Sequence, residues 1–501
     1  MTINIEEMAT FCKSKGFVYP AAEIYGGLSG FFDFGPLGTE LVNAIKASWW
    51  KKFVQDRADV IGIDGSLITH QKIWEASGHL AGFSDLMIVC SKCNTQVRAD
   101  QYLEEHIKKG SIKDTLVLEG ITAEEINKVV KAYNLKCPVC KSEFKEAKSF
   151  NLMFPISVGA EKDSDSVAYL RGETAQVIFT NFKIITETNR LKLPFGIAQI
   201  GKAFRNEISP RDFLFRVREF EQMEMEFFTH PDKRDDCPYY NEVKDMKVNY
   251  YDNKKQSVII IEKLPANKWL RYWIAKEYDW FLENGIKSDN LRIRQHTRHE
   301  LAHYAASCFD IEYNFPFGWK EIYGNADRKD FDLSQHEKTS KKDLKLFDEE
   351  TQKKVLPHVA SEPSQGVGRA FLAFMFDAYS YDSQRENVVL RLNPTLAPIK
   401  VALFPLMKKD GLAEKAEKVY DLIKKDFNNF YDVAGSIGKR YARMDEIGTP
   451  FCVTIDHDSL KHDDVTIRDR DTTHQVRVKI KDLKETLRKL VYGDIEFKNI
   501  K

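Results

Sequence analysis

The sequence has 501 residues, too many for one ordinary hydrophobic core, so we expect roughly two to four domains. Hydrophobic residues make up 43% and aromatic residues 12%, which excludes a globally disordered chain. The 75 basic and 75 acidic residues cancel, which argues against DNA or any other nucleic-acid backbone as a non-selective partner but leaves room for a selective RNA partner.

The N-terminal region contains no targeting signal. Residues 1–7 have neither the apolar run of a secretory signal nor the arginines of a transit peptide, and no apolar run reaches about 18 residues. We therefore expect a cytoplasmic protein with no membrane partner. Apolar residues recur at helical spacing from Thr39 to Arg57, after Gly35-Pro36, and predict a long amphipathic helix. Residues 59–69 predict a following strand.

Two cysteine pairs bracket an insert in the next part of the chain. Cys90-Ser-Lys-Cys93 and Cys137-Pro-Val-Cys140 are C-x-x-C knuckles, separated by a segment that is predicted to be helical over 122–134. Four thiolates suit tetrahedral Zn²⁺, and in a chain without a signal peptide paired cysteines indicate metal rather than disulfides. The gap between the pairs exceeds the usual zinc-ribbon spacing, and the helical insert accounts for it. We predict a structural zinc; the alternative is unligated buried cysteine.

Segments 195–207 and 216–228 alternate in polarity and predict two paired strands joined by a polar turn. In the second segment one face carries Arg216, Arg218, Phe220, Gln222, Glu224 and Glu226, and the other carries Met223, Met225 and Phe227. This pattern alone fits a functional site and a solvent-exposed sheet face about equally well.

The rest of the chain divides into a core segment and a C-terminal α/β unit. Aromatic residues at helical spacing from Trp269 to Asn284 predict an ordinary core helix, and the charge-dense stretch 337–354 predicts a solvated loop or helix. The composition changes near residues 393–398. After this point we expect strands at 399–404 and 451–455, a hairpin of 465–469 with 474–479, and helices at 413–427 and 480–491. Such alternation is typical of a compact α/β domain.

His299-Glu300-Leu301-Ala302-His303 matches H-E-x-x-H, the zinc-protease motif. Two histidines one helical turn apart would bind Zn²⁺, with Glu300 as general base, and this gives a metalloprotease as a competing function. The motif is short and arises by chance in a charged, histidine-rich stretch. We favour a helix whose histidines and glutamate support the floor of another site.

Two further segments carry phosphate chemistry. Residues 204–207, followed after a short loop by residues 216–220, resemble motif 2 of class II aminoacyl-tRNA synthetases. An arginine on a rigid strand can hold the α-phosphate of ATP and stabilise the charge that develops when a carboxylate attacks it. Residues 362–371 resemble motif 3, where glycines permit close backbone approach and Arg369 faces the terminal phosphates. The segment 39–69 resembles motif 1, except that Gly65-Ser66 replaces the usual proline.

The resemblance narrows to the glycyl-tRNA synthetases and runs over nearly the whole chain, from near Gly16 to about Val491. The segments that carry it are 171–176, 204–211, 303–305, 315–319 and 362–364. It implies ATP contacts at Arg205, Asn206, Glu207, Arg216, Val217, Phe220, Glu321, Ile322 and Arg369, with Arg205 and Arg369 catalytic. It implies glycine contacts at Arg98, Glu173, Glu224, Glu362 and Ser364.

The fold class that the resemblance implies is α+β: an antiparallel sheet flanked by helices, a zinc-binding insert and a C-terminal α/β anticodon-binding domain. The expected division is 1–88 for the first catalytic part, 89–150 for the insert, 151–392 for the main catalytic part with an insertion near 230–290, and 393–501 for the anticodon-binding domain. The implied activity is ATP-dependent attachment of glycine to tRNA(Gly) through glycyl-adenylate, with Mg²⁺, in a homodimer formed through the motif 1 helix.

Glycine has no side chain to recognise, so carboxylates must fix its ammonium while crowding excludes larger side chains. A substrate that lacks one methyl group for which a pocket has room loses only about 1–3 kcal/mol of binding energy. Rejection of larger substrates by size is therefore the stronger means of selection. The alternatives are a synthetase of another small amino acid and a catalytically inactive accessory protein. The latter is disfavoured because both phosphate arginines remain, and the protease is disfavoured because synthetase motifs flank residues 299–303.

Overall fold

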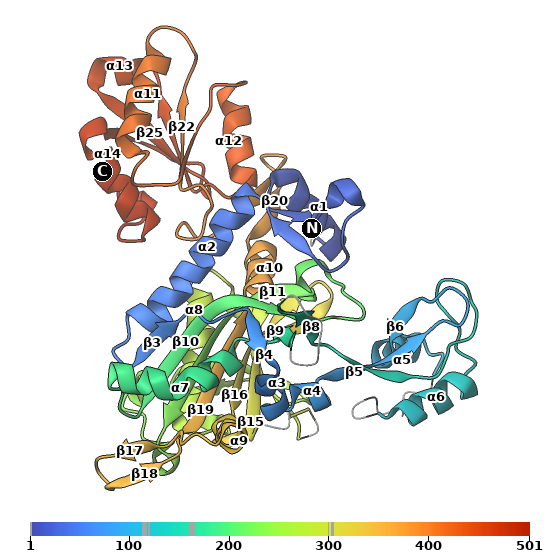
Figure 1. Ribbon diagram of the computed structural model, residues 1–501. Helices are drawn as coiled ribbons and strands as arrows, with labels where there is room; N and C mark the ends of the chain where they lie inside the picture. Colours follow the sequence, from blue (N-terminus) through green and yellow to red (C-terminus); the bar gives the residue numbers. More distant parts are fainter. Residues whose placement is uncertain are drawn as a thin grey trace.

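The computed structural model describes residues 3–112, 118, 121–159, 166–298, 300–301 and 305–500 (Figure 1). Helix α1 (Ile5–Lys15) begins with a capping box between Asn4 and Glu7 and ends at Gly16, which has a positive φ. The hairpin of β1 (Val18–Pro20) and β2 (Phe32–Phe34) follows. Among the described residues, no helix combines the length and the apolar character that a membrane span needs.

A nine-stranded sheet forms the centre of the molecule, and its neighbouring strands are mostly antiparallel. Its order is β13 (Gln256–Ile260), β12 (Lys247–Tyr251), β14 (Leu291–Gln295), β15 (Ser307–Phe315), β16 (Gly318–Asp327), β19 (His358–Gly366), β11 (Glu219–Thr229), β10 (Phe195–Phe204) and β3 (Val60–Ile63). Within the described pairings of this sheet, β3–β10 and β12–β14 are the parallel ones. The predicted strands at 195–207 and 216–228 are thus confirmed as neighbours in an antiparallel sheet, although β11 starts after the two arginines.

Both faces of the β10–β11 pair are buried, which removes the exposed-face interpretation. Met223, Met225 and Phe227 lie in the main hydrophobic core, where the Phe227 ring packs against Trp269 at 4.4 Å between centroids. On the opposite face Glu224 is 2% exposed. A long row of polar side chains on a buried face indicates a site rather than a solvent surface.

Helices cover the two faces differently. On the methionine face lie α2 (Pro36–Trp50), which continues as a π-helical turn over Lys51–Gln55, α8 (Lys268–Glu283) and α10 (Val367–Ala378). The glutamate face is covered in part by α7 (Ala175–Asn189) and α9 (Phe331–Ser340), which pack on Phe195 and Phe228. The predicted helices at 39–57 and 269–284 are confirmed.

Gly65 lies where the usual motif 1 proline is missing. Its N–H donates to Gln199 Oε1 at 2.7 Å, and a Cβ added here would lie 2.2 Å from Val177 Cγ1. The absence of a side chain therefore allows the chain to pass close to β10 and α7.

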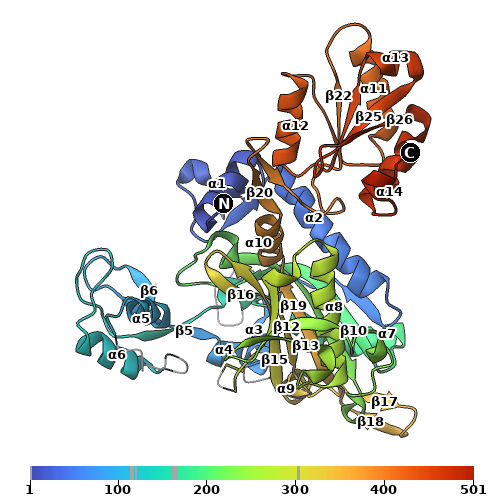
Figure 2. The ribbon, with the colours of Figure 1, turned by 180° about the vertical axis from the view of Figure 1, so that it is seen from behind.

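The insert forms a separate lobe that projects to one side of the main body (Figures 1 and 2). It contains β5 (Ser84–Val89), β6 (Gln96–Arg98), β7 (Lys148–Asn151), α5 (Ala99–Lys108) and α6 (Ala123–Ala132), and its core includes Ile88, Leu103 and Ile126. The predicted helix at 122–134 is confirmed, since α6 starts from the Thr122–Glu125 capping box. Between the insert and the sheet lie β4 (Ile68–His70), α3 (Gln71–Ala76), α4 (His79–Gly82), β8 (Phe154–Ser157) and β9 (Val167–Leu170).

The charge-dense stretch 337–354 differs from its prediction. It holds the end of α9 and then a two-stranded hairpin of β17 (Leu346–Asp348) and β18 (Lys353–Val355). The hairpin pairs Leu346 with Val355 and turns at Glu349–Gln352. The many charged residues of this stretch concealed its strand–turn–strand pattern.

The C-terminal domain follows the hairpin of β20 (Tyr379–Asp382) and β21 (Asn387–Leu390) and lies at the far end of α2 from β3 (Figure 1). Its sheet has the order β23 (Asn429–Tyr431), β22 (Val401–Pro405), β24 (Phe451–Ile455), β25 (Asp464–Asp469) and β26 (Gln475–Lys479). Its helices are α11 (Leu412–Ile423), α12 (Ile437–Glu446), α13 (His457–His462) and α14 (Ile480–Val491). The predicted α/β unit is confirmed, and β23, α12 and α13 are additions that the sequence pattern did not reveal.

Candidate active site

A cavity of about 430 Å³ opens on the glutamate face of the nine-stranded sheet. Its walls come from the β10–β11 connection, from β11, β15, β16 and β19, and from the start of α10. Of the predicted site residues it is lined by Glu173, Arg205, Glu207, Arg216, Val217, Phe220, Glu224, Glu321, Glu362, Ser364 and Arg369. Segments up to about 200 residues apart in the sequence therefore converge on one space, as expected of a ligand site.

Arg205 is held firmly at the end of β10. Its N–H donates to the Arg218 carbonyl at 2.9 Å, and its Nε donates to the Gly172 carbonyl at 3.1 Å. The guanidinium carbon lies 5.1 Å from the Phe83 ring centroid and 5.3 Å from that of Phe220. These contacts fix the base of the fork and leave its ends available to an anion in the cavity.

The neighbouring predicted residues divide between the cavity and its surroundings. Arg216 Nε pairs with Glu207 Oε2 at 2.7 Å, and its Nη2 lies 3.6 Å from Asp85. Arg98, on β6 of the insert, does not line the cavity; its Nη1 pairs with Asp85 at 2.8 Å, so one carboxylate joins it to Arg216. Burial, despite both arginines, raises the pKa of Asp85 above its ordinary value.

Two predicted ATP contacts lie outside the cavity lining. The Asn206 N–H donates to the Leu152 carbonyl at 2.7 Å, which ties the motif 2 turn to the segment before β8. The Ile322 side chain is 1% exposed and belongs to the main core, so it is only through its main chain that Ile322 can face a ligand.

Arg369 is the third residue of α10 and projects from the helix start. Its Nη1 pairs with Glu321 Oε2 at 3.0 Å, and its guanidinium lies 4.5 Å from the Phe215 ring centroid. Gly366 precedes the helix as its N-cap, and Gly368 approaches Leu214 closely. The helix start thus presents an arginine and free backbone N–H groups to the same cavity, an arrangement that suits anionic ligands.

A buried acidic group forms the deeper part of the site. Glu173, Glu224 and Glu362 are 6%, 2% and 7% exposed. Glu173 lies 3.2 Å from His79 Nε2 and accepts from Gln176 at 3.0 Å, while Glu224 accepts from the Thr174 hydroxyl. Carboxylates gathered at this depth favour a small cation as their partner.

The charges in this group are unevenly balanced. Arg328, which is 1% exposed, pairs with Glu362 and with Asp332 at 2.7 Å and lies 4.0 Å from Glu173. Burial raises the pKa of Glu173, but His79 and Arg328 outweigh it and hold that pKa below its ordinary value. Burial and the neighbouring carboxylates raise the pKa of Glu362 well above its ordinary value. The pocket therefore carries one firmly ionised acid next to acids that resist ionisation.

Ser364 joins this group through β19, where it lies opposite Glu224 of β11 in the strand register and accepts from Gln222 Nε2 at 3.2 Å. His79, Arg328 and Glu226 also belong to this buried group, although the sequence pattern did not assign them to it. No local sequence pattern indicates that His79 and Arg328 belong to this buried group. For Glu226 the strand alternation that it shares with Glu224 was a usable signal.

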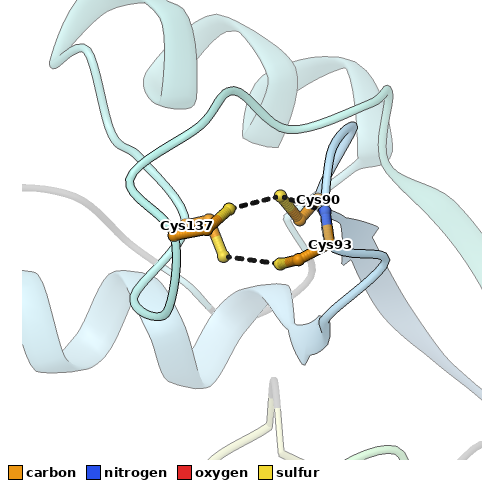
Figure 3. Close-up of side chains that lie close together, drawn as sticks. Cys90, Cys93 and Cys137 are labelled. Atoms are coloured by element: carbon orange, nitrogen blue, oxygen red, sulfur yellow. Dashed lines mark hydrogen bonds between the residues drawn. The ribbon is translucent and has the colours of Figure 1, made fainter.

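The four predicted metal ligands lie together in the insert. Figure 3 labels three of them, Cys90, Cys93 and Cys137. The Cys90 and Cys140 sulfurs are 3.3 Å apart and those of Cys93 and Cys137 are 3.6 Å apart, with all four within 4.8 Å of one another. A tetrahedral ion with Zn–S bonds of about 2.3 Å requires sulfurs about 3.8 Å apart, so the spacing fits. Hydrogen bonds from Ser142 lower the pKa of Cys140 to about 6, which favours the thiolate that a metal needs.

The H-E-x-x-H segment is described only in part, because His299 and His303 lie outside the described residues. Glu300 pairs with Arg294, accepts from the Thr297 N–H at 2.7 Å and lines the cavity. Of residues 299–303 only 300 and 301 are described, and they lie in a turn and a bend. The expected helix and the two histidines therefore stay predictions.

Comparison with known families agrees with this architecture. Residues 160–379 match the family model described as the tRNA synthetase class II core domain (G, H, P, S and T), and residues 400–490 match the one described as the anticodon binding domain. The chain is a class II aminoacyl-tRNA synthetase, with the core domain and the anticodon-binding domain of that class.

Whole-chain similarity is more specific. The chain is 46% identical to the glycine–tRNA ligase of Caldanaerobacter subterraneus subsp. tengcongensis over 481 residues, which cover 95% of this chain and 96% of the relative. It is 45% identical to that of Acetivibrio thermocellus, covering 96% and 97% of the two chains, and 44% identical to that of Geobacillus kaustophilus, covering 97% and 99%. The chain belongs to the glycine–tRNA ligase family. The predicted family, fold class and enzyme class are thereby confirmed.

Proposed function

We propose that this enzyme activates glycine with ATP and transfers it to tRNA(Gly). The observation that carries this is a buried acidic pocket that opens into an arginine-lined cavity: one part suits the ammonium of a small amino acid, and the other suits a triphosphate. Family membership supports the reaction, and the lining of the cavity supports the assignment of its residues.

In the first half-reaction the glycine carboxylate attacks the α-phosphate of ATP and pyrophosphate leaves. Arg205 takes the α-phosphate and the charge that develops on it, because its fork is already held by Gly172 and by two rings. Arg369 takes the terminal phosphates. Phe220 stacks on the adenine, and Asn206, Val217 and Ile322 contact ATP, Ile322 through its main chain.

Mg²⁺ fits the same end of the cavity, since Asp310 and Glu321 line it and offer the hard oxygen donors that the ion prefers. Bound there, the ion would neutralise charge on the phosphates. The chain itself supplies orientation, and no side chain has to act as a nucleophile because both attacking groups belong to the substrates.

Glycine is selected by charge and by crowding. Glu173, Glu224 and Glu362 hold the ammonium, while Ser364 accepts or donates beside it. Arg98 acts from the insert through Asp85 and the Arg216 side chain, so it orders the rim of the site. A methyl group on the substrate would meet buried, mutually bonded side chains, which cannot move aside without leaving polar groups unpaired.

The remaining parts of the proposal concern assembly. The four cysteines hold a structural Zn²⁺, because four thiolates leave no open coordination position. The domains follow the boundaries expected above, residues 393–501 bind the anticodon, and α2 forms the interface of a homodimer. The enzyme acts in the cytoplasm.

Exchange of pyrophosphate into ATP, measured with each of the twenty amino acids in the absence of tRNA, tests the central claim. Exchange with glycine alone supports both reaction and substrate. Exchange with another small amino acid would agree with an aminoacyl-tRNA synthetase but would refute the assignment of the acidic pocket to glycine. No exchange with any amino acid supports an inactive accessory protein.

A further inference from the structure

Glu226 is a fully buried carboxylate without a visible function. It is 0% exposed, and among the described residues neither of its oxygens has a hydrogen-bond partner. An unpaired carboxyl group at this depth is costly, and native structures rarely keep one without a reason. It lies two residues after Glu224 on β11, so both side chains project from the same face.

The side chain lies behind the proposed ammonium site. Carboxylate oxygens of Glu224, Glu226 and Glu362 are within 4.8 Å of one another. Glu224 and Glu362 line the cavity, whereas Glu226 is not among its lining residues. Glu226 therefore does not contact a ligand in the cavity directly. It can act on one only through Glu224 and Glu362, so its role is that of a positioning residue.

The charged groups that face Glu226 come from every element around it. They are Glu224 on β11, Glu362 on β19, Asp332 on α9 and Arg328 between β16 and α9. Three of these are acids, and the cation Arg328 is already shared among Glu362, Asp332 and Glu173. Burial first, and then repulsion from Glu362, raises the pKa of Glu226 well above its ordinary value, which favours the neutral form of this acid in the pocket without glycine.

We propose that Glu226 is a positioning residue for the substrate ammonium, and that it gives up its proton when glycine binds. The ammonium enters between Glu224 and Glu362 and supplies the positive charge that the three-carboxylate cluster lacks. The Glu226 carboxyl then ionises and its proton goes to solvent. The resulting carboxylate, on the far side of Glu224 and Glu362, adds to the electrostatic attraction of the ammonium. Glycine enters as a zwitterion and brings no net charge, and Glu224 and Glu362 keep their protonation in this step, so the ionisation of Glu226 is balanced by one proton released to solvent for each glycine bound.

This inference rests on the proposed function, and it predicts a separate observable, the pH dependence of glycine affinity. Because binding releases a proton, glycine affinity rises with pH until Glu226 ionises in the glycine-free protein, by about tenfold per pH unit at most. A glutamine at this position has the shape of the neutral acid but no proton to lose, so Glu226→Gln should fold and bind glycine without that pH dependence. Glu226→Asp keeps the ionisable group and should keep the dependence.

Glu277 on α8 supplies the matched control. It is also 0% exposed, has one unpartnered oxygen and a pKa that burial raises well above its ordinary value, but it is not a member of the three-carboxylate cluster. Glu277→Gln makes the same chemical change at the same depth and should leave the pH dependence of glycine binding as in the wild type.

The experiment measures the KM for glycine, the KM for ATP and the rate of pyrophosphate exchange from about pH 6 to pH 8, together with thermal unfolding of each full-length variant. The expected result for Glu226→Gln is a glycine KM that is flat with pH and about tenfold above the wild type at the highest pH, the equivalent of one pKa unit of interaction. The KM for ATP should stay within about twofold. Calorimetric glycine titration in buffers of different ionisation enthalpy should show proton release in the wild type and in Glu277→Gln, but not in Glu226→Gln.

Three results would overturn the inference. The first is an unchanged pH slope in Glu226→Gln, whatever its absolute KM. The second is loss of the slope in Glu277→Gln as well, which would indicate a general effect of buried acids. The third is saturable binding of Mg²⁺ to the ATP-free protein that Glu226→Gln abolishes, which would assign the cluster to a metal. A wild type without glycine-dependent exchange would refute the proposed function itself and this inference with it.

Discussion

Replacing Arg205 by alanine tests the proposed chemistry most directly. The side chain lines the cavity, and its Nε bond to Gly172 leaves two Nη groups for a phosphate. Loss of one preorganised donor to a developing charge costs about 10²–10³ in kcat, and a bidentate guanidinium offers two, so we expect a loss of at least about 10³-fold, or about 4 kcal/mol of transition-state stabilisation. Arg205→Lys keeps the charge without the fork and should recover only part of this.

The fold should survive the same change. The substitution removes one hydrogen bond and two arginine–ring interactions, together worth about 2–3 kcal/mol, from a chain with an extensive core. Glycine-dependent pyrophosphate exchange gives the activity, and thermal unfolding shows whether the protein remains folded. Arg211→Ala is the matched control, because Arg211 lies in the same connection, is 40% exposed and does not line the cavity. Normal exchange by a folded Arg205→Ala enzyme would refute the motif 2 assignment.

Three further changes have definite expected outcomes. Chelation should remove about one zinc per chain and lower the melting temperature of the insert, as measured by metal analysis and calorimetry; two zincs per chain would revive a site at His299 and His303. Arg328→Met should cost about 3–5 kcal/mol in urea unfolding, since it leaves buried carboxylates unpaired, and an unchanged midpoint would contradict the network. Hydrogen bonds from Arg477 lower the pKa of Asp456 to about 2, so the ionised pair stabilises the C-terminal domain above about pH 4 and is lost as pH falls towards 2. Asp456→Asn should weaken this acid dependence, by at most about 1 kcal/mol for a pair so near the surface, and an identical pH profile would refute the pairing.

The sequence pattern predicted those helices and strands whose signal lies in residues that are neighbours along the chain. The β10–β11 pair alternates clearly, and the helix start at Arg369 follows glycines, so both were predictable. In contrast, α12 contains little apolar sequence: its buried residues include Arg440 and Asp445, which form hydrogen bonds that only the fold provides. Polar residues that are buried by tertiary partners give no periodic signal, and this is why the helix escaped prediction.

The acidic pocket follows the same rule. Glu173 and Glu224 were predicted from the family resemblance, but their setting depends on His79 and Arg328, which come from α4 and from the turn between β16 and α9. Each of these two residues looks ordinary in its own neighbourhood. Their spatial meeting follows from strand order in the nine-stranded sheet, which a single sequence does not encode in any local pattern.

Glycine also explains why so much charge is buried here. A substrate without a side chain offers almost no apolar area, so its binding energy has to come from its two charged groups. Charges interact weakly in water and strongly at depth, which favours carboxylates that are shielded from solvent by α7 and α9. Their mutual repulsion destabilises the glycine-free pocket, and a single ammonium relieves it. On the proposed assignment of this pocket to glycine, the repulsion that Arg328 leaves unbalanced is a source of affinity for the smallest amino acid rather than a defect of the fold.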